Sequence, residues 1–223
     1  MYSNMNWEKL KLNKYKPVFI AFEGIDGSGK STISSMLAKK MSIEGHETIL
    51  TREPCGTNLK YSIKDLIKKV RIPIAQFMLF EAERLIHINE IIEPSLKKGI
   101  NVITDRFFDS SLVYQGISQN VPIKKLQEVH NIICQNINPN ITFYCYADNS
   151  IIYQRISSRR KVDLFENEIK LKMKKYKDAY DEIYKNKKNV VKIDTGKTAS
   201  QTLTDQIFEY LQETFYSKNK GEI

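Results

Sequence analysis

Residues 22–32 read FEGIDGSGKST. This stretch contains the pattern G-x-x-x-x-G-K-[ST], with glycines at Gly24 and Gly29, the lysine at Lys30 and the hydroxyl at Ser31. In this pattern, backbone N–H groups surround phosphates at a helix N-terminus, the lysine offers a positive charge, and the hydroxyl holds Mg²⁺. The predicted phosphate loop consists of Gly24, Ile25, Asp26, Gly27, Ser28, Gly29, Lys30, Ser31 and Thr32. The chain is therefore predicted to bind a nucleoside triphosphate.

Strands and helices are predicted to alternate on both sides of this loop. Apolar, β-prone runs predict strands at 17–23, 47–51, 100–106, 141–146 and 189–194. Helical spacing predicts helices at 32–44, 58–70, 73–99, 109–119, 122–137, 163–187 and 202–215. We expect Pro94 to bend the third of these helices, and Asp109 or Ser110 to cap the fourth. The alternation predicts a three-layer α/β/α domain with a five-stranded parallel sheet.

Length and charge restrict the possible partners. The 223 residues suit one domain, predicted at 17–218 after an extension at 1–16. The net charge is +9, but the lysines are spread along the chain and mixed with acidic residues. This favours anionic substrates over nucleic acid as the main partner. No apolar run approaches the length of a membrane span, so we expect no membrane partner.

The cysteines indicate a compartment, and a group of arginines indicates a lid. Cys55, Cys134 and Cys145 show no Cys-x-x-Cys spacing, which argues against a disulfide framework or a zinc site and for the cytoplasm. A polar segment at about 148–163 carries three arginines and is predicted to form a lid. They are Arg155, Arg159 and Arg160.

Charged residues follow two of the predicted strands. Arg52 and Glu53 follow the second strand, and Asp105 and Arg106 end the third. A local surface ion pair between Asp105 and Arg106 is one interpretation. Beside a phosphate loop we favour another, in which the acid orders Mg²⁺ and the arginine meets a second phosphate.

Four blocks together are similar to the thymidylate kinases, which phosphorylate dTMP to dTDP with MgATP. They are residues 22–32, TREP at 51–54, LFEAER at 79–84 and DRFFDSSLVYQG at 105–116. The resemblance extends from about residue 18 to 211 and implies a nucleoside monophosphate kinase fold. It also implies a homodimer. The last block distinguishes this family best from other nucleotide kinases.

The resemblance implies a role for each matching residue. Lys30 and Ser31 handle the ATP phosphates and Mg²⁺, and Asp105 helps to hold the metal. Asp26 lies near the 3′-hydroxyl of dTMP, and Arg106 aligns its phosphate. The further residues implied to bind dTMP are Arg52 at its phosphate, Glu53, Phe80 stacking on the thymine, Arg84 at a thymine carbonyl, Ser111 and Gln115 at the base edge, and Tyr114 against the sugar.

The chain departs from the family pattern at a few positions. Gly27 stands where some members carry an arginine, so the catalytic arginine is expected from the lid, among Arg155, Arg159 and Arg160. Cys55 stands where glycine is common, which could alter the loop after Pro54. Lys64 stands where many members have an arginine, and Phe107 stands where they more often have a tyrosine or a histidine. We expect weaker dTMP binding with retained activity.

Two alternative functions stay open at this point. One is another phosphate-loop nucleoside or nucleotide kinase, which would accept thymidine or other acceptors. The other is an ATPase that binds nucleic acid through its positive charge, which would show salt-sensitive DNA binding.

Overall fold

The structure, a computed structural model, describes residues 16–54, 56–57, 60–134, 137–158 and 166–216. Five strands in these ranges form one parallel sheet in the order β2-β3-β1-β4-β5. They are β1 Phe19–Glu23, β2 Thr48–Arg52, β3 Asn101–Asp105, β4 Ile141–Tyr146 and β5 Val190–Asp194. The predicted five-stranded parallel sheet is confirmed.

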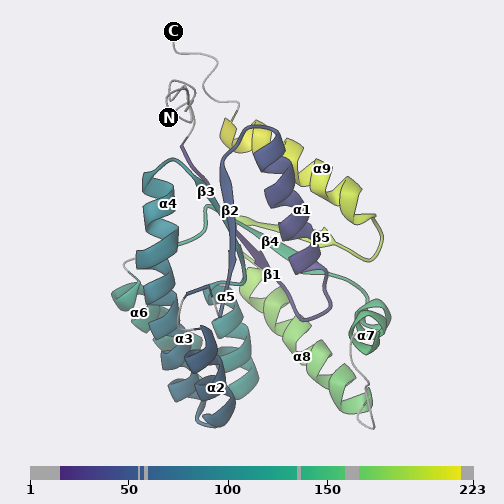
Figure 1. The fold of residues 1–223 in the computed structure, drawn as a ribbon. Helices are drawn as coiled ribbons and strands as arrows, with labels where there is room; N and C mark the ends of the chain where they lie inside the picture. The colour runs from purple at the N-terminus through teal and green to yellow at the C-terminus, as the bar shows by residue number, and fades with distance from the viewer. Residues whose placement is uncertain (1–15, 55, 58–59, 135–136, 159–165, 217–223) are drawn as a thin grey trace.

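Helices cover both faces of the sheet (Figure 1). Helices α1 and α9 pack against one face, and α3, α4, α5, α6 and α8 cover the other. Helix α2 lies against α3. The bounds are α1 Lys30–Ile43, α2 Lys60–Lys69, α3 Pro73–His87, α4 Glu93–Lys97, α5 Phe108–Ser111, α6 Ile123–Ile133, α7 Asn149–Ser157, α8 Glu166–Tyr184 and α9 Ser200–Leu211. This arrangement is the expected three-layer α/β/α architecture.

The central position of β1 places the phosphate loop at the middle of the sheet. All five β1 residues are buried, and β1 lies between β3 and β4. The register sets Phe22 beside Asp105, and Asp105 beside Arg52 on β2. Since the carboxyl ends of parallel strands share one edge, the segments after β1, β2 and β3 converge there.

The helix predicted at 73–99 is divided into three parts. Helix α3 passes into a π-helical turn at Ile88–Ile92, and α4 follows. Pro94 is in the first turn of α4. Proline has no N–H for an intrahelical bond, and a new first turn does not require one. The irregularity in this segment is thus a π turn that ends at Ile92, and the predicted bend at Pro94 stays a prediction.

The helix predicted at 109–119 begins earlier and is irregular. Helix α5 is capped at Phe107, and a π turn at Leu112–Gly116 and a 3₁₀ turn at Ile117–Gln119 follow it. The predicted caps, Asp109 and Ser110, were wrong. Glu23, 84 residues before Phe107, takes this role because its Oε1 accepts the N–H groups of Phe107 at 2.8 Å and Ser110 at 3.2 Å.

Helix α6 is shorter than predicted, and part of the segment predicted as a lid is helical. Helix α6 ends at Ile133, with Cys134 as its C-cap, instead of reaching 137. The first half of the expected lid is helical, as α7. Among the described residues, no helix combines the length and apolar character needed to span a membrane.

Candidate active site

The phosphate loop connects β1 to α1 through glycines in unusual backbone conformations. Gly24 has φ 141° and Gly29 has φ 88°. A Cβ atom at Gly24 would lie 2.3 Å from the carbonyl oxygen of Cys145, so a side chain is excluded there. No side chain caps α1, and its first turn has no acidic residue. The positive end of the helix dipole is therefore directed at the loop, where an anion can bind.

Lys30 lies at the start of α1 between two carboxylates. Its Nζ is 3.6 Å from Asp26 Oδ1 and 3.8 Å from Asp105 Oδ1. Burial lowers the pKa of Lys30, and the positive charge of Arg106 lowers it further, while Asp105 and Asp26 act in the opposite direction. The Lys30 side chain is thus buried beside the loop, between the two carboxylates.

Ser31 and Asp105 bring two hard oxygen ligands together. The Ser31 hydroxyl donates to Asp105 Oδ2. Asp105 Oδ1 is buried and accepts no hydrogen bond from any described residue. Carboxylate and hydroxyl oxygens are ligands that Mg²⁺ prefers, and the orphaned oxygen is suited to the metal or to a water bound to it. These residues therefore fit a magnesium site beside the phosphate loop.

Two cavities meet beside the loop. The first, about 340 Å³, surrounds the loop and is here called the donor cavity. It is lined by Asp26, Gly27, Gly29, Lys30, Ser31, Thr32, Arg52, Arg106 and Ile156. The second, about 290 Å³, is called the acceptor cavity. It is lined by Asp26, Glu53, Pro54, Ile67, Phe80, Arg84, Arg106, Phe107, Ser110, Ser111, Tyr114, Gln115 and Gln119.

Asp26 and Arg106 line both cavities and mark their junction. Arg106 Nη2 donates to Asp26 Oδ1 at 2.8 Å. A larger cavity of about 490 Å³ lies beside Phe108 and Lys187, but no residue of the phosphate loop lines it. A further cavity of about 420 Å³ shares Ser31 and Arg52 with the donor cavity but is lined by neither residue of this ion pair. We assign the site to the two cavities that meet at the pair.

Arg106 is held in a strained conformation by several partners. Its φ is +79°, which non-glycine residues rarely adopt. Nη1 donates to Ser110 Oγ at 2.9 Å, and the guanidinium carbon lies 5.3 Å from the Tyr114 ring centroid. Asp105 and Arg106 therefore do not form the local ion pair considered above. The neighbouring groups hold the guanidinium where the two cavities join.

Arg84 is buried, and Phe80 is half-buried, beside the acceptor cavity. Both side chains come from α3, four residues apart, so they share a face as predicted. Arg84 Nε donates to Glu53 Oε2 at 2.8 Å, and Nη2 donates to Ser111 Oγ at 3.2 Å. Phe80 offers an aromatic face on which a base can stack.

The remaining residues predicted to bind the acceptor divide between the two cavities. Ser111, Tyr114 and Gln115 line the acceptor cavity. Arg52 is exposed and lines the donor cavity. Glu53 is buried at the edge of the acceptor cavity, where it binds Arg84 and, through Oε1 at 3.1 Å, His87 Nδ1. The structure thus brings the predicted residues together, with Glu53 as a support for Arg84.

Of the three arginines in the predicted lid, the structure describes Arg155. Arg155 Nη1 donates to the Gly27 carbonyl at 3.3 Å and to Thr195 Oγ1 at 3.0 Å, and Nη2 donates to the Thr195 carbonyl at 2.8 Å. Arg155 therefore contacts the outside of the phosphate loop and lines neither cavity. Arg159 and Arg160 lie outside the described residues.

Two supporting residues were missed in the sequence. Glu23 is buried immediately before the loop, and its Oε2 accepts hydroxyl hydrogen bonds from Ser110 at 2.7 Å and Tyr180 at 2.9 Å. Thr195, at the end of β5, donates to the Ser28 carbonyl at 2.7 Å. Their positions at strand ends were the available signal, because strand ends face the ligand in sheets of this type.

The three departures from the family pattern are only partly described. Phe107 is buried and lines the acceptor cavity, so an apolar ring replaces a polar group there. Cys55 lies outside the described residues. Lys64 is within α2, but its side chain is not among those described. Weaker dTMP binding stays a prediction.

Comparisons with known proteins agree on one family. A family model described as "Thymidylate kinase" matches residues 22–207, which include every described residue that lines the two cavities. The thymidylate kinase of Thermosipho africanus is 33% identical over 191 residues, covering 84% of this chain and 94% of that protein. That of Thermosipho melanesiensis is 40% identical over 182 residues, covering 81% and 90%. A crystal structure of thymidylate kinase from Ehrlichia chaffeensis is 31% identical with a TM-score of 0.69, covering 87% of this chain and 98% of that one.

Proposed function

The chain belongs to the thymidylate kinase family, and we propose that its two connected cavities hold the two substrates of that family's reaction. It is an ATP-dependent enzyme that phosphorylates dTMP to dTDP. Its fold is the phosphate-loop nucleoside monophosphate kinase fold with a five-stranded parallel sheet. The observation that carries the assignment of substrates to cavities is the Arg106–Asp26 pair, which lines both.

In our proposal the donor cavity binds ATP. Backbone N–H groups of the loop and the N-terminus of α1 hold the phosphates, and Lys30 gives its charge to the terminal ones. Ser31 and Asp105 would hold Mg²⁺, supported by their contact and by the orphaned oxygen of Asp105. Bound Mg²⁺ would neutralise charge on the β- and γ-phosphates.

The acceptor cavity binds dTMP with its base between Phe80 and the irregular segment after α5. Phe80 stacks on the thymine, and Arg84 donates to a thymine carbonyl. Ser111 and Gln115 hydrogen-bond the base edge, and Tyr114 lies against the sugar and favours deoxyribose. Asp26 lies near the 3′-hydroxyl.

The dTMP phosphate then lies at the junction of the cavities, facing the γ-phosphate. Arg106 and Arg52 hold it in line for attack, since both line the donor cavity. A dTMP phosphate oxygen forms a bond to the γ-phosphorus, and the bond to the β–γ bridging oxygen breaks, releasing ADP. Because Arg155 is bound to Gly27 and Thr195, we assign the arginine that stabilises this transfer to Arg159 or Arg160 in the lid.

We further propose one kinase domain at 17–218, with a lid at about 148–163, that acts as a homodimer in the cytoplasm. Ile74 and Met78, one turn apart on α3, are exposed and offer an apolar surface to a second copy. The two cysteines that the structure describes, Cys134 and Cys145, are free, as expected in a reducing compartment. Sedimentation equilibrium tests the dimer, and a monomer at micromolar concentration would contradict it.

A coupled assay of ADP release tests the function. The enzyme is supplied with ATP and, in turn, dTMP, dUMP, dCMP, dGMP, dAMP and thymidine. We expect the highest kcat/KM with dTMP. Equal rates with all acceptors, or a preference for thymidine, would contradict the assignment of the acceptor cavity.

A further inference from the structure

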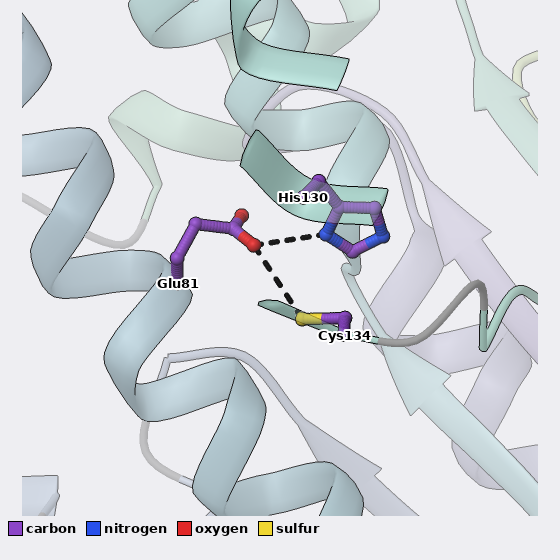
Figure 2. A group of neighbouring side chains, drawn as sticks. All are labelled: Glu81, His130 and Cys134. Atoms are coloured by element: carbon purple, nitrogen blue, oxygen red, sulfur yellow. Dashed lines mark hydrogen bonds and ion pairs between the residues drawn. The ribbon is translucent and has the colours of Figure 1, made fainter. Parts of the chain in front are cut away.

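A buried group of three side chains connects α3 to α6 behind the acceptor cavity. Glu81 from α3 points toward His130 on α6 and toward Cys134, the C-cap of α6, four residues later (Figure 2). Glu81 Oε2 lies 2.9 Å from His130 Nδ1 and 3.5 Å from Cys134 Sγ. All three are almost completely buried, and none lines the acceptor cavity. They therefore act on a substrate only through another residue.

The residue that they contact is Arg84. Its Nη1 donates to Glu81 Oε1, the oxygen that faces away from His130. Glu53 and Ser111 contact the guanidinium at Nε and Nη2. Arg84 is thus held from three directions, and two of its partners are carboxylates in a buried environment. Moving either carboxylate would change the direction of the guanidinium.

We propose that His130 is a positioning residue for dTMP recognition, which holds Glu81 so that Arg84 is directed at the 4-carbonyl of thymine. Cys134 supports the same carboxylate by a weaker hydrogen bond.

The inference rests on the proposed contact between Arg84 and the base. A guanidinium only donates hydrogen bonds, so it favours the thymine carbonyl over the amino group that cytosine carries at that position.

The hydrogen bond from Nδ1 is what a histidine contributes at this position. Burial alone would raise the pKa of Glu81, but Arg84, His130 and the hydrogen bond from Cys134 together lower it below its usual value, so Glu81 is ionised and accepts. The His130 ring stacks on Phe108, with centroids 3.8 Å apart and planes within 9°, which fixes the direction of Nδ1. Nε2 is buried and has no hydrogen-bond partner among the described residues. An apolar residue would avoid that cost, so packing alone does not account for a histidine here.

The same three side chains have atoms close enough to hold a metal ion. Two observations favour hydrogen bonding instead. Arg84 already places a positive charge on the Glu81 carboxylate, and a divalent cation would add a second. Burial and Glu81 raise the pKa of the Cys134 thiol to about 12, so the thiol is protonated and donates to Glu81.

The test compares two substitutions at His130 by steady-state kinetics. His130→Leu removes the donor, whereas the amide nitrogen of His130→Asn replaces Nδ1. We expect His130→Leu to raise the KM for dTMP on the order of tenfold, with the KM for ATP and kcat little changed. The ratio of kcat/KM for dTMP to that for dCMP should fall by a similar factor. His130→Asn should retain both values.

A matched control separates positioning from stability. Leu126→Ala removes a buried side chain from the same helix, and Leu126 makes no hydrogen bond to Glu81. It should lower the melting temperature without changing the KM for dTMP. If His130→Leu does the same, or if His130→Asn behaves like His130→Leu, the inference is overturned.

Two further variants keep the test decisive. If His130→Leu does not fold, Glu81→Gln removes the charge at nearly constant shape and should itself raise the KM for dTMP. An unchanged KM would overturn the inference.

Arg84→Lys keeps the charge but loses the planar fork, and should also reduce discrimination against dCMP. If Arg84→Lys changes nothing, the proposed base contact fails and the inference fails with it. If only Arg84→Lys has an effect, the base contact stands and the role of His130 alone is rejected.

Discussion

The donor and acceptor cavities touch the same Arg106–Asp26 pair but are built in different ways. The donor cavity is formed largely by consecutive residues of one loop and by the N-terminus of α1. The acceptor cavity takes residues from the ends of β1, β2 and β3, from α2 and α3, and from the segment around α5. In our proposal the donor cavity binds its substrate through backbone N–H groups and one lysine, and the acceptor cavity binds its substrate through side chains that contact one another. Substitutions should therefore affect the two sides separately.

The largest expected effect concerns the arginines of the proposed lid at about 148–163. Of the single alanine variants at Arg155, Arg159 and Arg160, we expect one at Arg159 or Arg160 to lower kcat by about 10³-fold, as loss of a transition-state arginine does. Arg155→Ala should lower kcat/KM for ATP only a few-fold, on the order of one hydrogen bond lost to the loop. Pre-steady-state measurement of ADP formation checks this. If all three alanine variants lose only a little kcat, the arginines are solvent-exposed charges without a catalytic role.

Lys30→Ala tests the donor side itself. We expect kcat to fall by roughly 10²–10³-fold, because the charge that meets the terminal phosphates is lost. The control is Lys39→Ala, an exposed lysine on the same helix, which should behave like the unmodified enzyme. Steady-state kinetics and a thermal melt distinguish a catalytic loss from unfolding. Near-normal turnover of Lys30→Ala would reject the assignment of the loop.

Phe80→Ala tests the acceptor side. Base stacking on an aromatic ring contributes about 1–3 kcal/mol, so the KM for dTMP should rise roughly tenfold or more while that for ATP changes little. Phe77, on the same helix but completely buried in the core, provides the contrast. Phe77→Ala should lower the free energy of unfolding by about 3–5 kcal/mol and leave the KM for dTMP unchanged. Equal increases in both KM values for Phe80→Ala would argue against stacking.

The contrast also explains what could be predicted from the sequence. The phosphate loop is a local motif, so its residues and the helix that follows it could be identified directly, and Ser31 could be proposed as a magnesium ligand. The buried contacts could not. His130 and Glu81 are 49 residues apart on helices whose packing is not visible in the pattern of either. The cap of α5 was mispredicted for the same reason, since its acceptor is Glu23 on the central strand.

The smallest expected effect concerns Glu23, the buried residue immediately before the phosphate loop. Burial and Asp109 raise its pKa, against opposing effects from Arg106 and its hydrogen bonds. A carboxyl with a raised folded-state pKa favours the folded state at low pH, and this contribution is lost as the pH rises through that pKa. Urea denaturation at about pH 5 and about pH 8 should therefore show a larger loss of stability for the unmodified protein than for Glu23→Gln. Equal losses would contradict the raised pKa.

The most direct test of the division between the cavities is a calorimetric titration of dTMP into the Lys30→Ala and Phe80→Ala proteins. We predict that Lys30→Ala binds dTMP with a Kd within about threefold of the unmodified enzyme, and that Phe80→Ala binds it roughly tenfold or more weakly. If Lys30→Ala loses dTMP binding while Phe80→Ala retains it, the assignment of the two cavities is wrong.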